Sequence, residues 1–154
     1  MIDGVIVTQL KQIYHPKGDV FHAMKCMDPG FAGFGEAYFS SIASGQTKAW
    51  KRHSRMTLNL VCIVGKIHFI LYDDRVKSDS FGKFMEITLS PEKPDSYLRL
   101  TVPPGVWMAF VGISSNKSVL LNLANIPHDP EEQVNIPPEE SHIKFDFDKI
   151  DLSV

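Results

Sequence analysis

The feature that most constrains the fold of this chain is the recurrence of short β-forming runs. No segment of a dozen residues keeps a 3.6-residue apolar period free of glycine and proline, whereas β-branched and aromatic runs alternate with turn signals such as Pro103-Pro104-Gly105. An all-β sandwich or barrel is therefore expected, and a jelly roll is one arrangement that leaves few exposed edges. The predicted strands are residues 4–13, 20–26, 36–42, 48–53, 57–64, 66–73, 84–89, 97–102, 106–113 and 119–125.

Size and charge restrict the class of protein further. The chain has 154 residues, 44% of them apolar, which suits one domain with one core. Its 16 basic and 18 acidic residues give a formal charge of −2 without a basic block, which disfavours binding to nucleic acid or to an anionic membrane. The longest apolar run, residues 58–72, is interrupted by Gly65, Lys66 and His68, so no membrane span is expected. The amino terminus lacks a signal-peptide pattern, and we expect a cytoplasmic protein.

The cysteines and the C-terminal tail carry structural predictions. Cys26 and Cys62 lie far apart in apolar settings, so both are expected to be buried free thiols. The chain becomes acidic and proline-rich after Ala124, which predicts a surface loop with little regular structure. Residues 143–148 alternate like a strand that either caps the barrel or trails away. We therefore divide the chain into a domain at 1–134 and a tail at 135–154.

The stretch from residue 51 to residue 61 concentrates polar side chains. If it is extended, alternation places Lys51, His53, Arg55, Thr57 and Asn59 on one face. That face is either the solvated side of a half-buried strand or, in a small barrel, the lining of a ligand cavity. Cations and an amide suit an anionic or oxygen-rich ligand, because Arg binds phosphate as a planar fork and Lys as a point charge.

Three segments that follow residue 61 carry a family resemblance. They are GKIHFILYDDRVKSDSFGKF at residues 65–84, ITLS at 87–90 and LTVPPGVWMAF at 100–110. In this order they resemble the dTDP-4-dehydrorhamnose 3,5-epimerase family of the cupin superfamily. The likeness runs from about Val5 to Val134 and is strongest from Lys48 to Phe110.

The resemblance implies a fold and an activity. It implies a cupin jelly roll, a double-stranded β-helix, in a metal-free homodimeric enzyme without a cofactor. The implied substrate is a nucleotide-linked 4-keto-6-deoxy sugar used in deoxysugar and surface-polysaccharide biosynthesis. In the family a His removes a proton next to the keto group, a Tyr returns one from the opposite face, and a Lys stabilises the enolate. His53 falls on the position of the base, and we expect Lys51 to oppose the enolate charge.

Further residues are expected to bind the substrate. Arg55 and Asn59 would line the pocket. Lys17 matches a family Arg that holds the diphosphate, often across a dimer interface, although it also suits an exposed turn. Tyr38 matches a polar substrate contact or is a core aromatic residue, and Trp107 either stacks on a base or sugar or packs.

The sequence also departs from the family. The family's acid Tyr corresponds to Leu121, and its enolate-stabilising Lys has no secure counterpart. Metal-binding cupins use a set of His and Glu ligands, of which only His53 is present here, while Lys51 and Met108 occupy two other ligand positions. Two further interpretations therefore stay open. One is an enzyme that moves a proton at a single carbon, and the other is a non-catalytic cupin that binds a sugar nucleotide or a carbohydrate.

Overall fold

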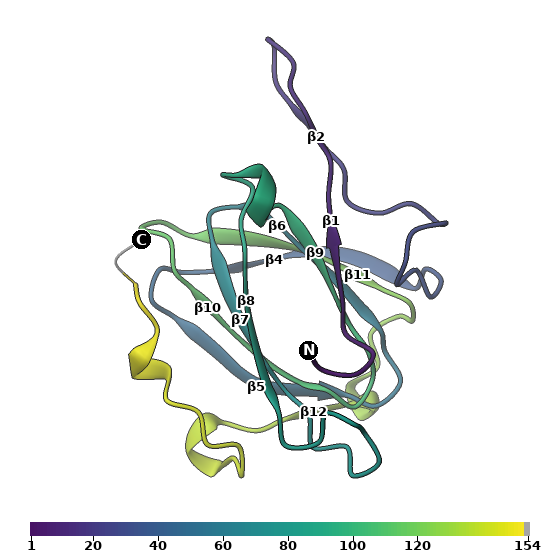
Figure 1. Cartoon of the computed structure of the whole chain (residues 1–154), viewed down its shortest axis with the longest axis vertical. Helices are drawn as coiled ribbons and strands as arrows, with labels where there is room; N and C mark the ends of the chain where they lie inside the picture. The colour runs from purple at the N-terminus through teal and green to yellow at the C-terminus, as the bar shows by residue number, and fades with distance from the viewer. Residues whose placement is uncertain (153–154) are drawn as a thin grey trace.

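Two antiparallel sheets of five strands each face one another in a computed structural model, of which we describe residues 1–152 (Figure 1). The first sheet has the order β1-β9-β6-β11-β4, and the second has the order β12-β5-β10-β7-β8. Most neighbours in a sheet are distant in the chain, as β6 and β11 are, which is the connectivity of a jelly roll. The prediction of a single all-β jelly-roll domain is confirmed.

The elements have the following bounds. The first sheet contains β1 (Ile6–Gln9), β4 (Glu36–Ile42), β6 (Leu58–Val64), β9 (Leu98–Val102) and β11 (Ser118–Ala124). The second contains β5 (Thr47–His53), β7 (Ile67–Tyr72), β8 (Phe84–Leu89), β10 (Trp107–Gly112) and β12 (Gln133–Asn135). A separate hairpin joins β2 (Gln12–Ile13) to β3 (Val20–Phe21), and short 3-10 helices are η1 (Pro94–Ser96), η2 (Pro130–Glu132), η3 (Pro138–Glu140) and η4 (Phe147–Lys149).

Apolar side chains from both sheets fill most of the space between them. Alternation along β6 turns Leu58, Leu60 and Cys62 inward, so Asn59 and Val61 point to the outer face. Burial of this apolar surface is the main driving force for pairing the sheets. The inward residues of the second sheet that complete the core include Ile67, Phe69, Leu71, Leu89 and Met108.

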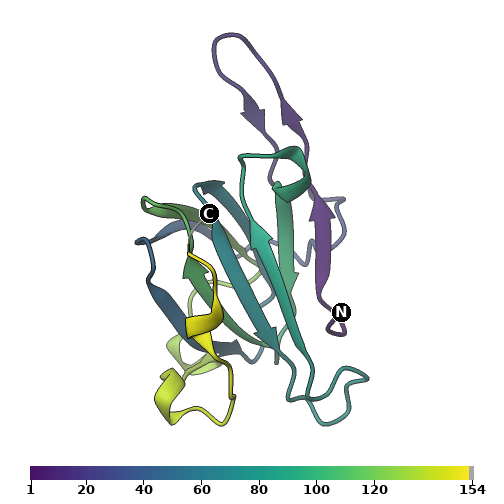
Figure 2. The same cartoon turned by 60° about the vertical axis from the view of Figure 1, so that its left-hand side comes forward.

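The C-terminal tail packs on the outer face of the second sheet. Ile143 is buried there, and the Phe145 and Phe147 rings lie 6.5 and 5.7 Å from the Trp50 ring. Figure 2 shows this yellow segment running along the outside of the barrel. The alternation predicted for 143–148 does not produce a strand. Its apolar side chains anchor the tail instead, and the chain turns into η4.

The hairpin of β2 and β3 projects away from the barrel (Figures 1 and 2). The predicted strand 4–13 is therefore divided into β1 and β2, and the strand predicted at 20–26 is only two residues long. After Phe21 the chain crosses the outer face of the first sheet. The buried Arg99 guanidinium donates there to the carbonyls of Ala23 and Pro29, so these groups are not available to a neighbouring strand.

The two cysteines are both free thiols, but their environments differ. Cys62 is buried and free, and burial raises the pKa of its thiol to about 12. Cys26 is also free but is exposed, because the loop that carries it lies on the surface; the prediction of burial was wrong here.

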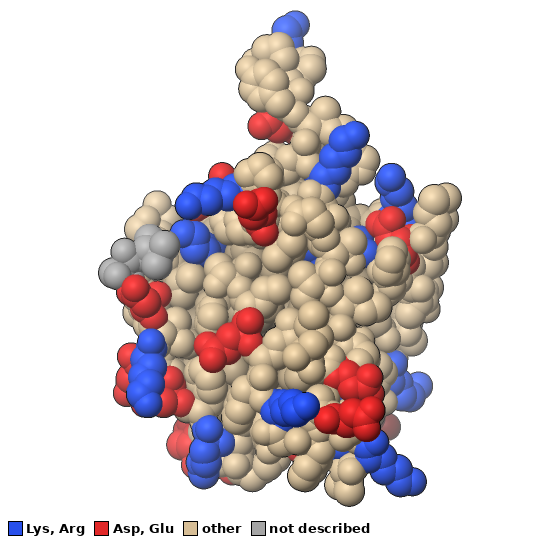
Figure 3. All heavy atoms as spheres, viewed as in Figure 1, with Lys and Arg blue, Asp and Glu red and all other residues tan. Residues whose placement is uncertain are grey.

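Figure 3 shows basic and acidic side chains interspersed on one face. Within residues 1–152, no helix has the length and apolar character required to cross a membrane.

Candidate active site

A cavity of about 450 Å³ lies between the two sheets. One wall comes from β4 and β11 of the first sheet, and the other comes from β5 and β10 of the second. Its volume falls within the range of small-molecule sites. The polar residues that line it are Tyr38, Ser40, Thr47, Lys48, Lys51, Asn122 and Asn135.

An irregularity in β5 brings two lysines to this cavity. Met108 of β10 lies opposite Lys51, and Phe110 lies opposite Lys48, so two residues of β5, Ala49 and Trp50, share the place opposite Ala109. Such a bulge changes the alternation of side chains along the strand. Lys48 and Lys51 consequently line the same cavity, although simple alternation would place them on opposite faces. The sequence analysis missed Lys48 for this reason.

His53 ends β5 on the same face as Lys51, two residues further along the strand. Its backbone is fixed by Gly105, whose N–H donates to the His53 carbonyl at 2.7 Å. The residue is 8% exposed, and the Nδ1 of its imidazole forms a hydrogen bond with the Glu132 carboxylate. Its Nε2 is buried and has no hydrogen-bond partner among the described residues.

The Glu132 carboxylate is held by several groups at once. Its Oε2 accepts the backbone N–H groups of Arg55 at 3.1 Å and Met56 at 3.2 Å. The Ser54 hydroxyl and N–H both donate to the Glu132 carbonyl, at 2.9 and 2.8 Å. Glu132 ends η2, which Asp129 caps through the Glu131 N–H. The carboxylate is therefore fixed before any ligand arrives.

The charges of this pair follow from burial and contact. Burial lowers the pKa of His53, although its hydrogen bond to Glu132 opposes the change. Burial alone would raise the pKa of Glu132, but the bonds from His53 and from the backbone outweigh it, so the pKa is lowered. A carboxylate only accepts hydrogen bonds, so the proton of the neutral imidazole lies on Nδ1 and Nε2 presents a lone pair. This arrangement is that of an oriented general base.

Lys51 is a half-buried lysine two residues before this base, on the same face of β5. Burial lowers the pKa of Lys51, and the negative charge of Glu132 partly offsets that effect. Lys48 is more exposed and donates to the Ser41 carbonyl at 3.0 Å. The second sheet thus presents two lysines to the cavity, and the neutral base follows Lys51 by two residues on the same face of β5.

The structure places the other predicted site residues differently. Residues 51–61 do not form one extended strand, because β5 ends at His53 and β6 begins at Leu58. Arg55 lies in the intervening turn and forms an ion pair with Asp129 at 2.7 Å, with 64% of its side chain exposed. Asn59 points to the outer face, where it donates to the Gly30 carbonyl and accepts from Thr101. The expected common face for Lys51, His53, Arg55 and Asn59 was therefore wrong beyond His53.

Three more predicted residues are divided between the cavity and other regions. Tyr38 lines the cavity from β4. Trp107 is buried on the outer face, where its Nε1 donates to Asp74 at 2.8 Å and the Arg52 guanidinium lies 4.5 Å from its ring. Lys17 is exposed at the end of the projecting hairpin, between β2 and β3.

Glu132 is the functional candidate that sequence reasoning missed. It lies in the acidic, proline-rich segment predicted to be a loop of little regular structure. That prediction was wrong at residues 133–135, where β12 pairs with the edge of β5 and brings Gln133 opposite His53. The available signal was the step from Asp129-Pro130, a helix cap followed by proline, to the alternating β-branched residues Val134 and Ile136.

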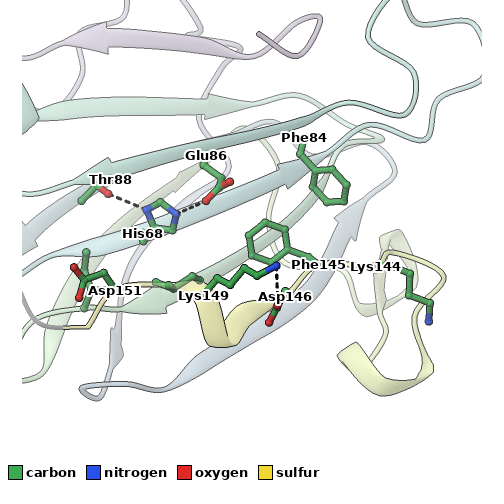
Figure 4. Close-up of a pocket in the computed structure, with 11 residues that line it drawn as sticks. His68, Phe84, Glu86, Thr88, Lys144, Phe145, Asp146, Lys149 and Asp151 are labelled. Carbon is green, nitrogen blue, oxygen red and sulfur yellow. Dashed lines mark hydrogen bonds and ion pairs between the residues drawn. The ribbon is translucent and has the colours of Figure 1, made fainter.

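A second, larger cavity of about 760 Å³ lies on the outer face of the second sheet, beneath the tail (Figure 4). Its histidine, His68, has both ring nitrogens engaged, by Thr88 and by Glu86, each at 2.9 Å. Lys149, also shown there, pairs with Asp146 at 3.1 Å. This cavity therefore offers no free ring nitrogen, and the interior cavity is the better candidate for catalysis.

The jelly roll and its polar interior cavity define the class of protein, a cupin fold with a site for a small molecule. The sequence model of dTDP-4-dehydrorhamnose 3,5-epimerase matches residues 47–154. The chain belongs to this family. No curated protein matches the sequence.

Solved structures agree with this assignment. A dTDP sugar isomerase from Desulfovibrio desulfuricans G20 has a TM-score of 0.93 and 38% identity, over 99% of this chain and 96% of that one. A 3'-monoepimerase from Streptomyces bikiniensis, solved with dTDP, has a TM-score of 0.77 and 14% identity, covering 90% and 71%. A sugar 3,4-ketoisomerase from Thermoanaerobacterium thermosaccharolyticum, solved with TDP, has a TM-score of 0.70 and 19% identity, covering 87% and 89%. At these lower identities the last two share the fold.

Proposed function

We propose that this chain is an epimerase or isomerase of deoxysugar biosynthesis that acts on a dTDP-linked 4-keto-6-deoxy sugar. Its reaction begins with removal of a proton from a carbon next to the ketone. The observation that carries this proposal is the His53 imidazole, which is bonded through Nδ1 to a buried carboxylate and has a free Nε2. Family membership supplies the class of substrate.

The first chemical step transfers one proton. The C–H bond breaks, its proton goes to His53 Nε2, and its electron pair forms the double bond of an enolate whose charge rests on the former keto oxygen. Lys51 provides the positive charge that stabilises this oxygen. The imidazolium that results is stabilised by Glu132, which is already fixed by backbone donors.

The geometry of the cavity fits this role. Base and lysine come from neighbouring positions of one strand, so a sugar ring placed between the sheets meets both from the same side. Lys48 adds a second cation toward the exposed end of β5, where a diphosphate would lie. The placement of Arg55 and Asn59 outside this cavity removes the support for direct contacts between these residues and the sugar.

A homodimer is part of the proposal. The hairpin of β2 and β3 carries Lys17 away from the barrel of its own chain (Figure 1) and exposes Ile13, Tyr14 and Phe21. Such an apolar arm suits contact with a second copy, where Lys17 would reach the partner's diphosphate. As an enzyme of nucleotide-sugar metabolism, the protein is expected to act in the cytoplasm.

Proton NMR in deuterated water tests the function directly. The protein is incubated with dTDP-4-keto-6-deoxyglucose, and deuterium is followed at the carbons on either side of the ketone. The same measurement with the GDP- and CDP-linked sugars tests the nucleotide. We expect deuterium to enter the dTDP sugar, and we expect His53→Gln to reduce the rate by at least about 10³-fold.

A matched control is available on the outer face. His68→Gln removes the other histidine that is paired with a glutamate, and it is expected to leave the rate unchanged. If wild-type protein binds the sugar nucleotide but exchanges no proton, the catalytic proposal is wrong. If His53→Gln exchanges protons as fast as His68→Gln, His53 is not the base.

A further inference from the structure

The cavity contains one tyrosine, and it stands on the wall opposite Lys51, whose strand ends at His53. Tyr38 belongs to β4 in the first sheet, whereas His53 and Lys51 belong to β5 in the second. The inward direction of Tyr38 follows from its register, because it pairs with Asn122, which also lines the cavity. Facing sheets are about 10 Å apart, which leaves room for a sugar ring between these two walls.

The other tyrosines of the described chain are unavailable to this cavity. Tyr72 packs in the outer cluster with Trp107, and the Tyr97 hydroxyl donates to the His22 carbonyl at 2.9 Å. Tyr14 is 81% exposed in the projecting hairpin. Leu121, which aligns with the family's acid Tyr, packs against the outer cluster of Leu10, Val61 and Tyr97. The position of the family's acid therefore does not supply a proton donor here.

The hydroxyl of Tyr38 is free to act. Among residues 1–152 it forms no hydrogen bond, although the Tyr38 backbone carbonyl accepts from Asn122 at 3.4 Å. Burial, with a contribution from Glu36, raises the pKa of this phenol. It therefore stays protonated at neutral pH and is a donor rather than an acceptor. Ser40, its neighbour along β4, already accepts a hydrogen bond from Asn122 at 3.0 Å and has a far less acidic hydroxyl.

We propose that Tyr38 is the catalytic acid that returns a proton to the sugar from the face opposite His53. This inference rests on the proposed function. In this step the enolate re-forms the ketone, its C=C electron pair takes the Tyr38 hydroxyl proton to make a new C–H bond, and a tyrosinate remains. The proton on the His53 imidazolium then passes to the tyrosinate through solvent, which restores both groups. Removal on one face and return on the other inverts the carbon.

Replacing Tyr38 separates two measurements, epimer formation and solvent exchange, which would fall together if Tyr38 had only a structural role. Without Tyr38, His53 still removes the proton, exchanges it with solvent and returns deuterium to the same face. In deuterated water, Tyr38→Phe is therefore expected to form the epimer at least about 100-fold more slowly. Deuterium should still enter the unreacted dTDP-4-keto-6-deoxyglucose within about three-fold of the wild-type rate.

Tyr72→Phe is the matched control, since it makes the same change on the outer face. It should preserve both epimer formation and exchange, whereas His53→Gln should lose both. The inference is overturned if Tyr38→Phe forms the epimer at the wild-type rate, or if it loses exchange to the extent that His53→Gln does. If wild-type protein exchanges no proton, the proposed function fails first, and that result is separate from any effect of Tyr38.

Discussion

The chain contains two histidine–glutamate pairs in contrasting environments. His53 and Glu132 lie inside the barrel, with side chains 10% and 1% exposed. His68 and Glu86 lie on the outer face, where the corresponding values are 18% and 50%. In the first pair only Nδ1 of the imidazole is engaged, whereas in the second Thr88 and Glu86 engage both ring nitrogens.

The difference shows that a residue pair alone does not make a catalytic base. The carboxylate of Glu132 is held by two backbone N–H groups, whereas Glu86 reaches its histidine from an exposed strand. Burial keeps His53 neutral, and the free Nε2 can accept a proton.

The largest expected effect comes from replacing the two glutamates. Glu132→Gln should lower the rate of solvent exchange into dTDP-4-keto-6-deoxyglucose by about 10³-fold, because an amide N–H facing Nδ1 favours the tautomer with its hydrogen on Nε2. Glu86→Gln should leave the rate within about three-fold of wild type. The measurement is deuterium incorporation by proton NMR. Equal losses in the two variants would remove the distinction between the pairs.

The second-largest expected difference in catalytic rate is between variants of the lysines in the two cavities. Lys51→Met removes the charge beside the developing oxyanion, and we expect the catalytic rate to fall by about 100-fold. Lys149→Met, which breaks the outer pair with Asp146, should have no effect on the rate. Steady-state kinetics would show the loss in kcat rather than in KM alone. A normal kcat for Lys51→Met would show that Lys48 or another group stabilises the enolate.

Replacing the two glutamates should also lower the free energy of unfolding by different amounts, with the larger loss at the inner pair. Glu132→Gln weakens several charge-assisted hydrogen bonds in a buried setting, so the free energy of unfolding should fall by about 2 kcal/mol. Glu86→Gln removes a half-exposed pair and should cost less than about 1 kcal/mol. Urea denaturation of both variants measures the difference. A larger loss for Glu86→Gln would mean that the outer pair, and not the inner one, is structural.

The smallest expected effect is in the pH profile. His53 must be neutral to accept a proton, so activity falls as the pH drops through its folded pKa. Burial lowers that pKa, which places the fall below the ordinary value of 6.5. Because Glu132 opposes the lowering, Glu132→Gln should move the residual activity's fall to still lower pH. The pH dependence of kcat/KM tests this, and a fall above pH 6.5 would contradict the assignment of the base.

Much of the fold was predictable from local pattern. The strands from β4 to β11 correspond to predicted runs within one or two residues at each end, because β-branched and aromatic residues alternate there between strong turn signals. The errors occur where tertiary contacts determine the backbone. Arg99 holds the chain after Phe21 away from any strand, and β12 forms only because β5 offers it an edge.

The candidate site was predictable only in part. His53 and Lys51 could be predicted as site residues because they share one face of a single strand. Tyr38 was named as a polar contact from the family resemblance. Arg55 and Asn59 were misplaced because the chain turns after His53, which period-two alternation does not anticipate. Lys48 could not be predicted to line the cavity, because this requires the bulge opposite Ala109, for which the sequence of β5 gives no signal.

The sequence by itself determined that this chain is a β-rich domain with a histidine and a lysine on one strand, since both properties depend on residues close together in the chain. Only the tertiary structure decided which carboxylate contacts this histidine and which tyrosine lines the cavity. Glu132 lies 79 residues after His53, and Tyr38 comes from the opposite sheet. Such contacts depend on how sheets pair and pack, and that pairing is a property of the whole chain rather than of any local pattern.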